Sequence, residues 1–396
     1  MKILILNARF GMGHYSVSKA LEQEIKEYDI NAEVQLIDIF DYCLPRNSKK
    51  IYGSYNYFIN KGANIYNAYY HYTNNRKSNI KIPFQHYFIK KTGQLINNEK
   101  PDLIISTFPI CSLLVSEYKK ISDDNILLLT CITDISGHKD WYHKNTDFYF
   151  AASSTTKAEI INRGVLPEQV FISGIPVKKQ FKVKRDIQKR NSCNEYLVNK
   201  SRNILLMGGG LGMLPDDEAF YKRLNMLENV KVTIITGTNK KIHRNLYGKF
   251  DHIDVISYTE QVDQYMKEAD LIITKPGGIT LFESIASELP ILVFQPFLAQ
   301  EIHNADFIER NKIGKVVEKK LEDSLEEIFN LLSDESFLEN CRGNMRNIQN
   351  EIETTTIKNL LSTLEEKLFD NGQTQLIGSR KYVQQDLIHR KEGTAL

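Results

Sequence analysis

Apolar runs of β-strand length alternate with amphipathic helical patterns along almost the whole chain. Continuous apolar segments such as ILLLTCI and DLIIT suit strands that helices cover on both faces. The alternation predicts an α/β fold of parallel sheets with right-handed crossovers. Strands are expected over Lys2–Ala8, Glu33–Ile39, Asp102–Thr107, Asn125–Thr133, Asp147–Ala152, Val170–Ile175, Asn203–Met207, Lys231–Thr236, Asp254–Tyr258, Leu271–Thr274, Ile291–Gln295 and Lys315–Val317.

The chain is long for a single hydrophobic core, and its pattern restarts midway. It has 396 residues, so two domains are expected. A polar, charged segment at Lys178–Arg202 precedes NILLMGGGLG, a second strand that runs into glycines as ILILNARFGMG does. We therefore expect two Rossmann-like, doubly wound domains over 1–180 and 201–370, a linker over 181–200 and a polar tail over 371–396.

Composition narrows the class of protein. The five cysteines are scattered without a CxxC pair, which is typical of a reduced, intracellular chain without a zinc ribbon. The first residues resemble a strand more than a signal peptide, and no apolar run reaches the ~20 residues that span a bilayer. A net charge of +2 argues against wholesale nucleic-acid binding. The sequence thus favours a cytoplasmic protein whose membrane contact, if any, is peripheral.

The first glycine turn, Gly11-Met12-Gly13-His14, follows the first strand. A glycine turn at a helix start presents free backbone N–H groups at the sheet edge where open α/β folds bind ligands. A dinucleotide fingerprint would need a third glycine at Ser16, so NAD fits poorly. The turn could instead serve only close packing. A neutral His14 at this position could accept a proton from a substrate hydroxyl.

The stretch 42–98 contains no Asp or Glu, but it contains nine Lys or Arg and many Tyr and Phe residues. Basic residues mixed with aromatic ones suit an anionic membrane surface, where each basic group contributes on the order of 1 kcal/mol. A helical insertion with internally packed tyrosines and solvated lysines is an alternative. Nucleic-acid binding is a weaker one, because no DNA- or RNA-binding motif accompanies the stretch.

The second half carries two further glycine turns after strands. The segment 208–212 could cradle a diphosphate but lacks the Gly-Lys-Ser/Thr of a P-loop. Lys275-Pro276-Gly277-Gly278-Ile279-Thr280 opens a helix. Thr280 and Glu283 form a capping-box pattern, whereas Glu283 could equally bind both hydroxyls of a ribose. Gln300 and Glu301 could contact sugar hydroxyls or simply begin a helix.

Several ordered motifs together resemble a known group of enzymes. KPGGITLFESIASELPILVFQPFLAQEIHNADF, the GMGH turn, PDLIISTFP, TDISGHKDWYHKNTDFYFAAS and ISGIPVKKQF are similar to segments of processive diacylglycerol glucosyltransferases and monogalactosyldiacylglycerol synthases. The resemblance spans about residues 1 to 350. It implies a GT-B fold, with two Rossmann-like domains facing across a cleft, acceptor binding in the first and UDP-sugar binding in the second.

The resemblance also implies roles for particular residues. His14 and Asp134 are the expected catalytic pair, and either could be the base. The acceptor side is expected at Gly11, Gly13, Thr133 and His138. The donor side is expected at Gly209, Gly210, Gly237, Ser257, Tyr258, Lys275, Pro276, Gly277, Gly278, Thr280, Glu283, Gln300, Glu301 and Asn304. Glu283 would bind the ribose, and Gln300 and Glu301 the sugar.

The implied activity is inverting transfer of a hexose from a UDP-sugar, glucose or galactose, to the hydroxyl of a diacylglycerol-like lipid at the inner face of the cell membrane. No DxD-type carboxylate pair is evident, so neither metal nor cofactor is expected. The GGGLG run and Ser136-Gly137 depart from the family pattern. A transferase acting on a metabolite or antibiotic, a lipid-linked N-acetylglucosaminyltransferase, a UDP-sugar epimerase and a non-catalytic UDP-sugar sensor are the alternatives.

Overall fold

The computed structural model describes residues 1–61, 63–74, 82–182, 201–294, 296, 298–317, 324–352, 357–362 and 364, without the side chains of 55–61, 63–65 and 69. It divides into an N-terminal unit, Met1–Lys178 with Ile352–Leu396, and a C-terminal unit, Lys179–Glu351. The sequence placed the end of the second domain near residue 370 instead. Most of the predicted linker and all of the predicted tail lie outside the described residues.

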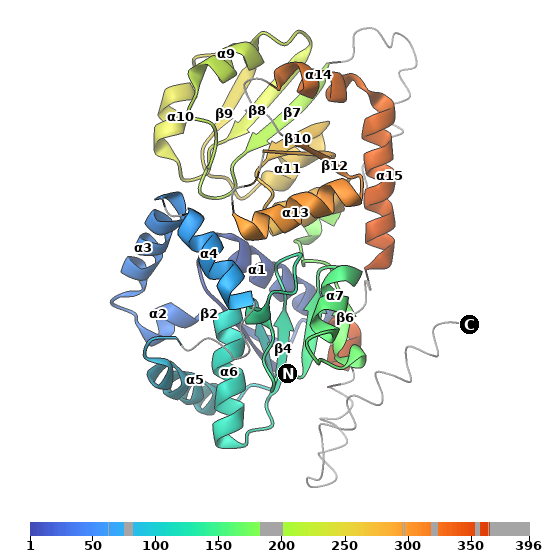
Figure 1. The fold of residues 1–396 in the computed structure, drawn as a ribbon. Coiled ribbons are helices and arrows are strands. Elements are labelled where there is room, and N and C mark those ends of the chain that lie inside the picture. The colour runs from blue at the N-terminus through green and yellow to red at the C-terminus, as the bar shows by residue number, and fades with distance from the viewer. Residues whose placement is uncertain are drawn as a thin grey trace, which may run out of the picture. The chain divides into compact units, whose positions relative to one another are not determined.

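The N-terminal unit contains one parallel sheet in the order β2-β1-β3-β4-β5-β6. Its strands are β1 (Lys2–Asn7), β2 (Glu33–Asp38), β3 (Leu103–Ser106), β4 (Leu127–Cys131), β5 (Phe148–Ala151) and β6 (Val170–Ile172). Its helices are α1 (Gly13–Tyr28), α2 (Ile39–Cys43), α3 (Ser48–Lys61), α4 (Ala63–Asn74), α5 (Gln85–Glu99), α6 (Pro109–Ser122) and α7 (Ser154–Ile161), with short turns η1 (Lys139–Trp141) and η2 (Pro167–Gln169) (Figure 1).

The C-terminal unit contains a second parallel sheet in the order β12-β11-β10-β7-β8-β9. Its strands are β7 (Arg202–Met207), β8 (Val230–Ile235), β9 (Ile253–Ile256), β10 (Leu271–Thr274), β11 (Ile291–Phe294) and β12 (Gly314–Val317). Its helices are α9 (Glu218–Asn225), α10 (Lys240–Leu246), α11 (Val262–Glu268), α12 (Gly278–Ala286), α13 (Ala299–Arg310), α14 (Leu325–Ser333) and α15 (Glu335–Glu351), preceded by the turn η3 (Lys179–Lys182).

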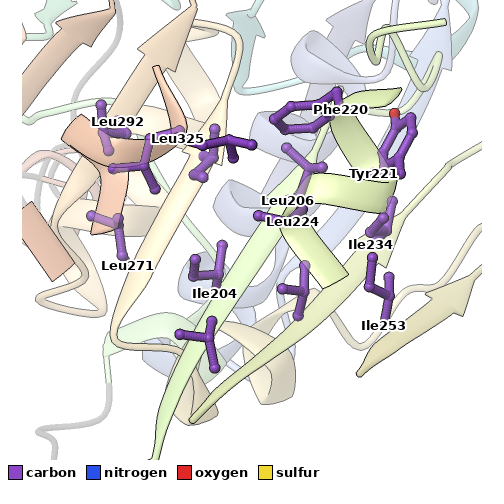
Figure 2. Packing of buried hydrophobic residues seen from close by; sticks show 14 of the residues in the cluster. Ile204, Leu206, Phe220, Tyr221, Leu224, Ile234, Ile253, Leu271, Leu292 and Leu325 are labelled. Carbon is purple, nitrogen blue, oxygen red and sulfur yellow. The ribbon is translucent and has the colours of Figure 1, made fainter. Parts of the chain in front are cut away.

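Every strand expected from the sequence is present, and the predicted pair of Rossmann-like sheets is confirmed. Side chains from the strands and from the covering helices form the core of each unit. In the C-terminal unit, Leu206 of β7, Leu224 of α9 and Ile234 of β8 lie in one cluster of buried side chains (Figure 2). Burial of apolar area on both faces explains why these strands are continuously apolar.

A buried ion pair joins α6 to Asp147, the residue before β5, in the N-terminal unit. The Lys119 ammonium contacts the Asp147 carboxylate, whose Oδ2 also accepts a hydrogen bond of 2.8 Å from the Leu128 backbone N–H. The Lys119 side chain is almost completely buried. Removing one partner from such a pair leaves an uncompensated buried charge, which costs more than the intact pair contributes.

We predict that Lys119→Met lowers the free energy of unfolding of the N-terminal unit by about 3–5 kcal/mol. Asp147→Asn in the same chain should recover much of this loss, because no unpaired charge then remains. Trp141 is the one tryptophan and lies in this unit, so its fluorescence during urea unfolding reports the unit selectively. A double variant as unstable as Lys119→Met would contradict this explanation.

Candidate functional site

The first glycine turn links β1 to α1 in the N-terminal unit. Gly11 has φ 78°, a left-handed conformation that favours glycine, and no atom lies within 4 Å of the position a Cβ would take. The backbone conformation at Gly11 therefore favours glycine, and close packing against neighbouring atoms does not explain the residue type. The helix begins at Gly13, so His14 lies in its first turn.

His14 is held through one ring nitrogen. Its Nδ1 lies 2.9 Å from the backbone oxygen of Thr107 and 2.9 Å from Oγ1 of Thr133. A carbonyl oxygen can only accept, so Nδ1 carries the proton and donates it to Thr107. In the neutral ring the basic lone pair then belongs to Nε2, for which the described residues provide no hydrogen-bond partner. Such a ring can accept a proton from a bound hydroxyl.

The surroundings of His14 keep it neutral. Burial lowers its pKa, while the Asp134 carboxylate and the hydrogen bond to Thr107 act in the opposite direction and only partly offset this effect. Asp134 itself accepts a hydrogen bond of 3.0 Å from Nε1 of Trp141. The ring of Phe108 packs edge-on at 4.9 Å between centroids. Because the pKa is lowered, the imidazole is available as a base at neutral pH.

His138, an expected acceptor-side residue, uses both ring nitrogens within the fold. Its Nε2 lies 3.1 Å from the backbone oxygen of Tyr70, and its Nδ1 accepts from the backbone N–H of Asp140 at 3.2 Å. The side chain is buried. Through these bonds His138 holds neighbouring segments together. We therefore expect it to affect an acceptor by positioning these segments.

The second glycine turn follows β7 in the C-terminal unit and closes on the turn after β8. Gly209 and Gly237 have φ 67° and 54°. The N–H of Thr238 donates to the backbone oxygen of Gly210 at 3.0 Å. A Cβ on Gly237 would lie 2.6 Å from that same oxygen, so this contact requires glycine. The turn after β8 thus supports the glycine turn after β7.

Lys275 follows β10, the strand that pairs with β7, and lies beside the same turn. A Cβ on Gly209 would lie 3.3 Å from Cε of Lys275. The ammonium of Lys275 lies 3.1 Å from Oε1 of Glu301, whose side chain is buried. The glycine turn is therefore accompanied by a cation that is already paired with Glu301. Backbone N–H groups and an ammonium are groups that bind phosphate oxygens.

The capping-box interpretation of Thr280 and Glu283 is wrong. The N-cap of α12 is Gly277, no side chain caps it, and Thr280 is the third residue of the helix. The first N–H groups of α12 lie at the positive end of the helix dipole, and the N-cap contributes no side-chain acceptor to them. Glu283 lies one turn further along and is half-buried. The capping box no longer explains its presence there.

The remaining donor-side residues differ in their surroundings. Nδ2 of Asn304 donates to the backbone oxygen of Pro276 at 2.8 Å and so ties α13 to the turn after β10. Gln300 is half-buried in the first turn of α13, whereas Ser257 and Tyr258 are exposed after β9. No three His, Cys, Asp or Glu side chains gather as a metal site in the part of the chain that the structure describes.

The residues that hold His14 and Asp134, the expected catalytic pair, are not singled out by any motif in the sequence. Thr107 orients His14 through its backbone, and Trp141 binds Asp134 through its indole N–H. Thr107 could have been found, because it follows β3 and the ends of adjacent parallel strands lie together. The Trp141 contact has no comparable signal, since it depends on the path of the loop between β4 and η1.

We predict that the pKa of His14, measured by NMR titration of the labelled ring, lies below the ordinary 6.5. Asp134→Asn should lower it further, because the carboxylate favours the charged ring. Thr133→Val is the matched control, because it removes a hydroxyl that contacts Nδ1 of the ring and changes no charge. A pKa that rises in Asp134→Asn would contradict the assigned electrostatics.

Comparisons with known proteins identify the family of this chain. The monogalactosyldiacylglycerol synthase family model matches residues 14–177, and the model of the family 28 glycosyltransferase C-terminal domain matches residues 203–361. A processive diacylglycerol beta-glucosyltransferase of Bacillus pumilus is 31% identical, over 90% of this chain and 93% of that protein. The enzyme of that name from Bacillus subtilis is 29% identical, over 88% and 91% of the two chains.

Solved structures share the fold at low identity. MurG of Acinetobacter baumannii has a TM-score of 0.57 at 14% identity, covering 89% of this chain and 98% of its own. The UDP-GlcNAc 2-epimerase of Neisseria meningitidis bound to UDP-GlcNAc has a TM-score of 0.56 at 13% identity, covering 93% and 100%. Fold, ordered motifs and sequence relatives together assign this chain to the glycosyltransferase family of the monogalactosyldiacylglycerol synthases and processive diacylglycerol glucosyltransferases.

Proposed function

We propose that the protein transfers a hexose from UDP-glucose or UDP-galactose to the hydroxyl of diacylglycerol, with inversion at the anomeric carbon, and so forms a glycolipid. The observation that carries this proposal is the state of His14. Its Nδ1 is committed to the Thr107 carbonyl, and its basic Nε2 has no partner among the described residues. This is the arrangement that activation of an acceptor hydroxyl requires.

In the proposed reaction the acceptor oxygen attacks the anomeric carbon of the sugar. The proton of the acceptor hydroxyl moves to Nε2 of His14 as the bond between the acceptor oxygen and the anomeric carbon forms. The bond from that carbon to the diphosphate breaks, and UDP leaves with the electron pair. Asp134 stabilises the imidazolium that results, since its charge favours the protonated ring. Trp141 keeps this carboxylate oriented through its indole N–H.

The C-terminal unit serves the donor in this proposal. The N–H groups at the start of α12 and the Lys275 ammonium stabilise the charge that develops on the departing diphosphate. Glu283 binds the ribose hydroxyls, and Gln300 and Glu301 bind the sugar. Because Glu301 is paired with Lys275, one contact links the phosphate and sugar parts of the site. The proposed stabilisation of the diphosphate uses groups of the chain alone.

The fold alone does not choose between reactions, because a MurG structure and a UDP-GlcNAc 2-epimerase structure resemble it equally well. The sequence relatives favour the transferase. The related Bacillus proteins are named for glucosyl transfer to diacylglycerol, and the matching family is named for a galactolipid. These names support diacylglycerol as acceptor and leave glucose and galactose as the two donor sugars.

We further propose that the stretch 42–98 binds an anionic membrane surface. Phe84 is 82% exposed at the start of α5, Tyr72 and Tyr87 are exposed as well, and Arg46, Lys49, Lys50 and Lys90 are exposed basic residues of the stretch. Its other described aromatics, such as Tyr52 and Phe88, pack inside. No helix among the described residues is long and apolar enough to cross a membrane.

We predict that His14→Ala lowers kcat roughly 10²–10⁴-fold, because the general base is lost, and leaves the donor KM nearly unchanged. Glu283→Ala should show the opposite pattern, with a raised donor KM and a smaller effect on kcat. Steady-state release of UDP in the presence of diacylglycerol measures both. Substantial turnover in His14→Ala would assign the base elsewhere, with Asp134 the first candidate.

We predict that Phe84→Ser weakens binding to vesicles of equal parts phosphatidylglycerol and phosphatidylcholine by roughly ten- to a hundredfold, because an aromatic side chain contributes roughly 1.5–3 kcal/mol on burial. Salt should weaken binding of the unaltered protein as well. Ile30→Ser is the matched control, since Ile30 is 86% exposed outside the stretch. Equal binding to pure phosphatidylcholine vesicles in cosedimentation would contradict the electrostatic part of the proposal.

A further inference from the structure

The C-terminal end of α4 packs against the segment 136–139, which follows Asp134. The hydroxyl of Tyr70 lies 2.8 Å from Oγ of Ser136, and the two side chains are buried. The ring of Tyr70 lies 4.2 Å from the ring of His138 between centroids. Oγ1 of Thr73 lies 3.3 Å from Nε2 of the same histidine. Tyr70 therefore contacts this segment through both its hydroxyl and its ring.

A second set of contacts holds the segment from two sides. Oδ1 of Asn74 accepts from the backbone N–H of Lys139 at 3.1 Å and from Nη2 of Arg163 at 2.7 Å. Nε of Arg163 donates to the backbone oxygen of Gly137 at 2.8 Å, and the Gly137 N–H donates to Glu159. The segment 136–139 is thus fixed between α4 and the end of α7.

This packing explains the small residues at Ser136-Gly137. A Cβ on Gly137 would lie 2.9 Å from Cβ of Glu159 and 3.3 Å from Cγ1 of Ile160, so a larger residue would push the segment away from α7. Ser136 supplies the hydroxyl that Tyr70 contacts. The pair Ser136-Gly137 is therefore matched to Tyr70 on one side and to α7 on the other.

The same segment continues directly from the residues around His14. Thr133 contacts the His14 ring, and Asp134 acts on its charge. Burial raises the pKa of the Tyr70 hydroxyl most, and the nearby carboxylates of Asp134, Glu159 and Asp140 raise it further. Asp134 lies two residues before Ser136, so displacement of the segment 136–139 would shift Asp134 relative to His14.

We propose that Tyr70 is a positioning residue for hexose transfer, which holds Asp134 beside His14 through its hydroxyl contact with Ser136 and its ring contact with His138. A tyrosine of the basic aromatic stretch then serves the reaction centre, and α4 links that stretch to the residues that activate the acceptor. The inference rests on the proposed transfer reaction and adds a residue that no motif in the sequence indicates.

Tyr70→Phe tests this link, because it keeps the ring and removes only the hydroxyl. We expect kcat/KM for the acceptor to fall about two- to tenfold, the effect of one net hydrogen bond, with the donor KM unchanged. We also expect the acid limb of the pH profile to move to lower pH, in the direction expected for Asp134→Asn, because Asp134 would no longer raise the pKa of His14.

Ser136→Ala removes the same contact from the other side and guards against a folding defect in the first variant. The double variant should lose no more than either single one, since both remove one interaction. Tyr118→Phe is the matched control, because its hydroxyl contacts Asn97 and Asp124 and none of the site residues. It should leave the acid limb in place.

The inference would be overturned if Tyr70→Phe and Ser136→Ala changed the acid limb and the acceptor kcat/KM no more than Tyr118→Phe does. The proposed function would then remain intact. Additive losses in the double variant would overturn it as well. Wild-type protein that transferred no hexose would instead contradict the proposed function, and this inference would fall with it.

Discussion

The pairing of β1 with β3 brings the two halves of the acceptor-side site together. These strands are neighbours in the sheet although β2 separates them along the chain, so right-handed crossovers carry their following helices to opposite faces. The two connections diverge at the carboxyl ends of the strands and leave a crevice there. His14 follows β1 and Thr107 follows β3, so the hydrogen bond that orients the His14 ring spans this point.

In the C-terminal sheet the strand order reverses in the same way between the neighbouring strands β7 and β10. The glycine turn follows β7 and Lys275 follows β10, which explains why residues far apart in sequence approach each other beside Gly209. In each unit the candidate site residues thus lie at the point where the strand order reverses. The polar groups differ. One unit has a neutral imidazole, which suits a proton acceptor, and the other has an ammonium and the N–H groups of a helix start, which suit an anion site.

The strands could be predicted because their apolar runs are long and continuous, as in Leu127–Cys131. The glycine turns could be predicted for the same reason, since they end such runs. The start of α12 was misplaced, because a capping pattern at Thr280 was locally as good as the true N-cap at Gly277. Contacts such as Trp141 with Asp134, or Tyr70 with Ser136, depend on how loops and an inserted helix return to the sheet, and local sequence carries no such information.

The central claim is that one chain joins a UDP-hexose to diacylglycerol through base catalysis with inversion. The most direct measurement incubates the protein with labelled UDP-glucose or UDP-galactose and diacylglycerol, followed by mass spectrometry and NMR of the extracted lipid. We expect a labelled hexosyl diacylglycerol with a β-anomeric linkage from the α-linked donor. Labelled sugar that stays in the aqueous phase as an interconverted UDP-sugar, with no lipid product, would contradict it.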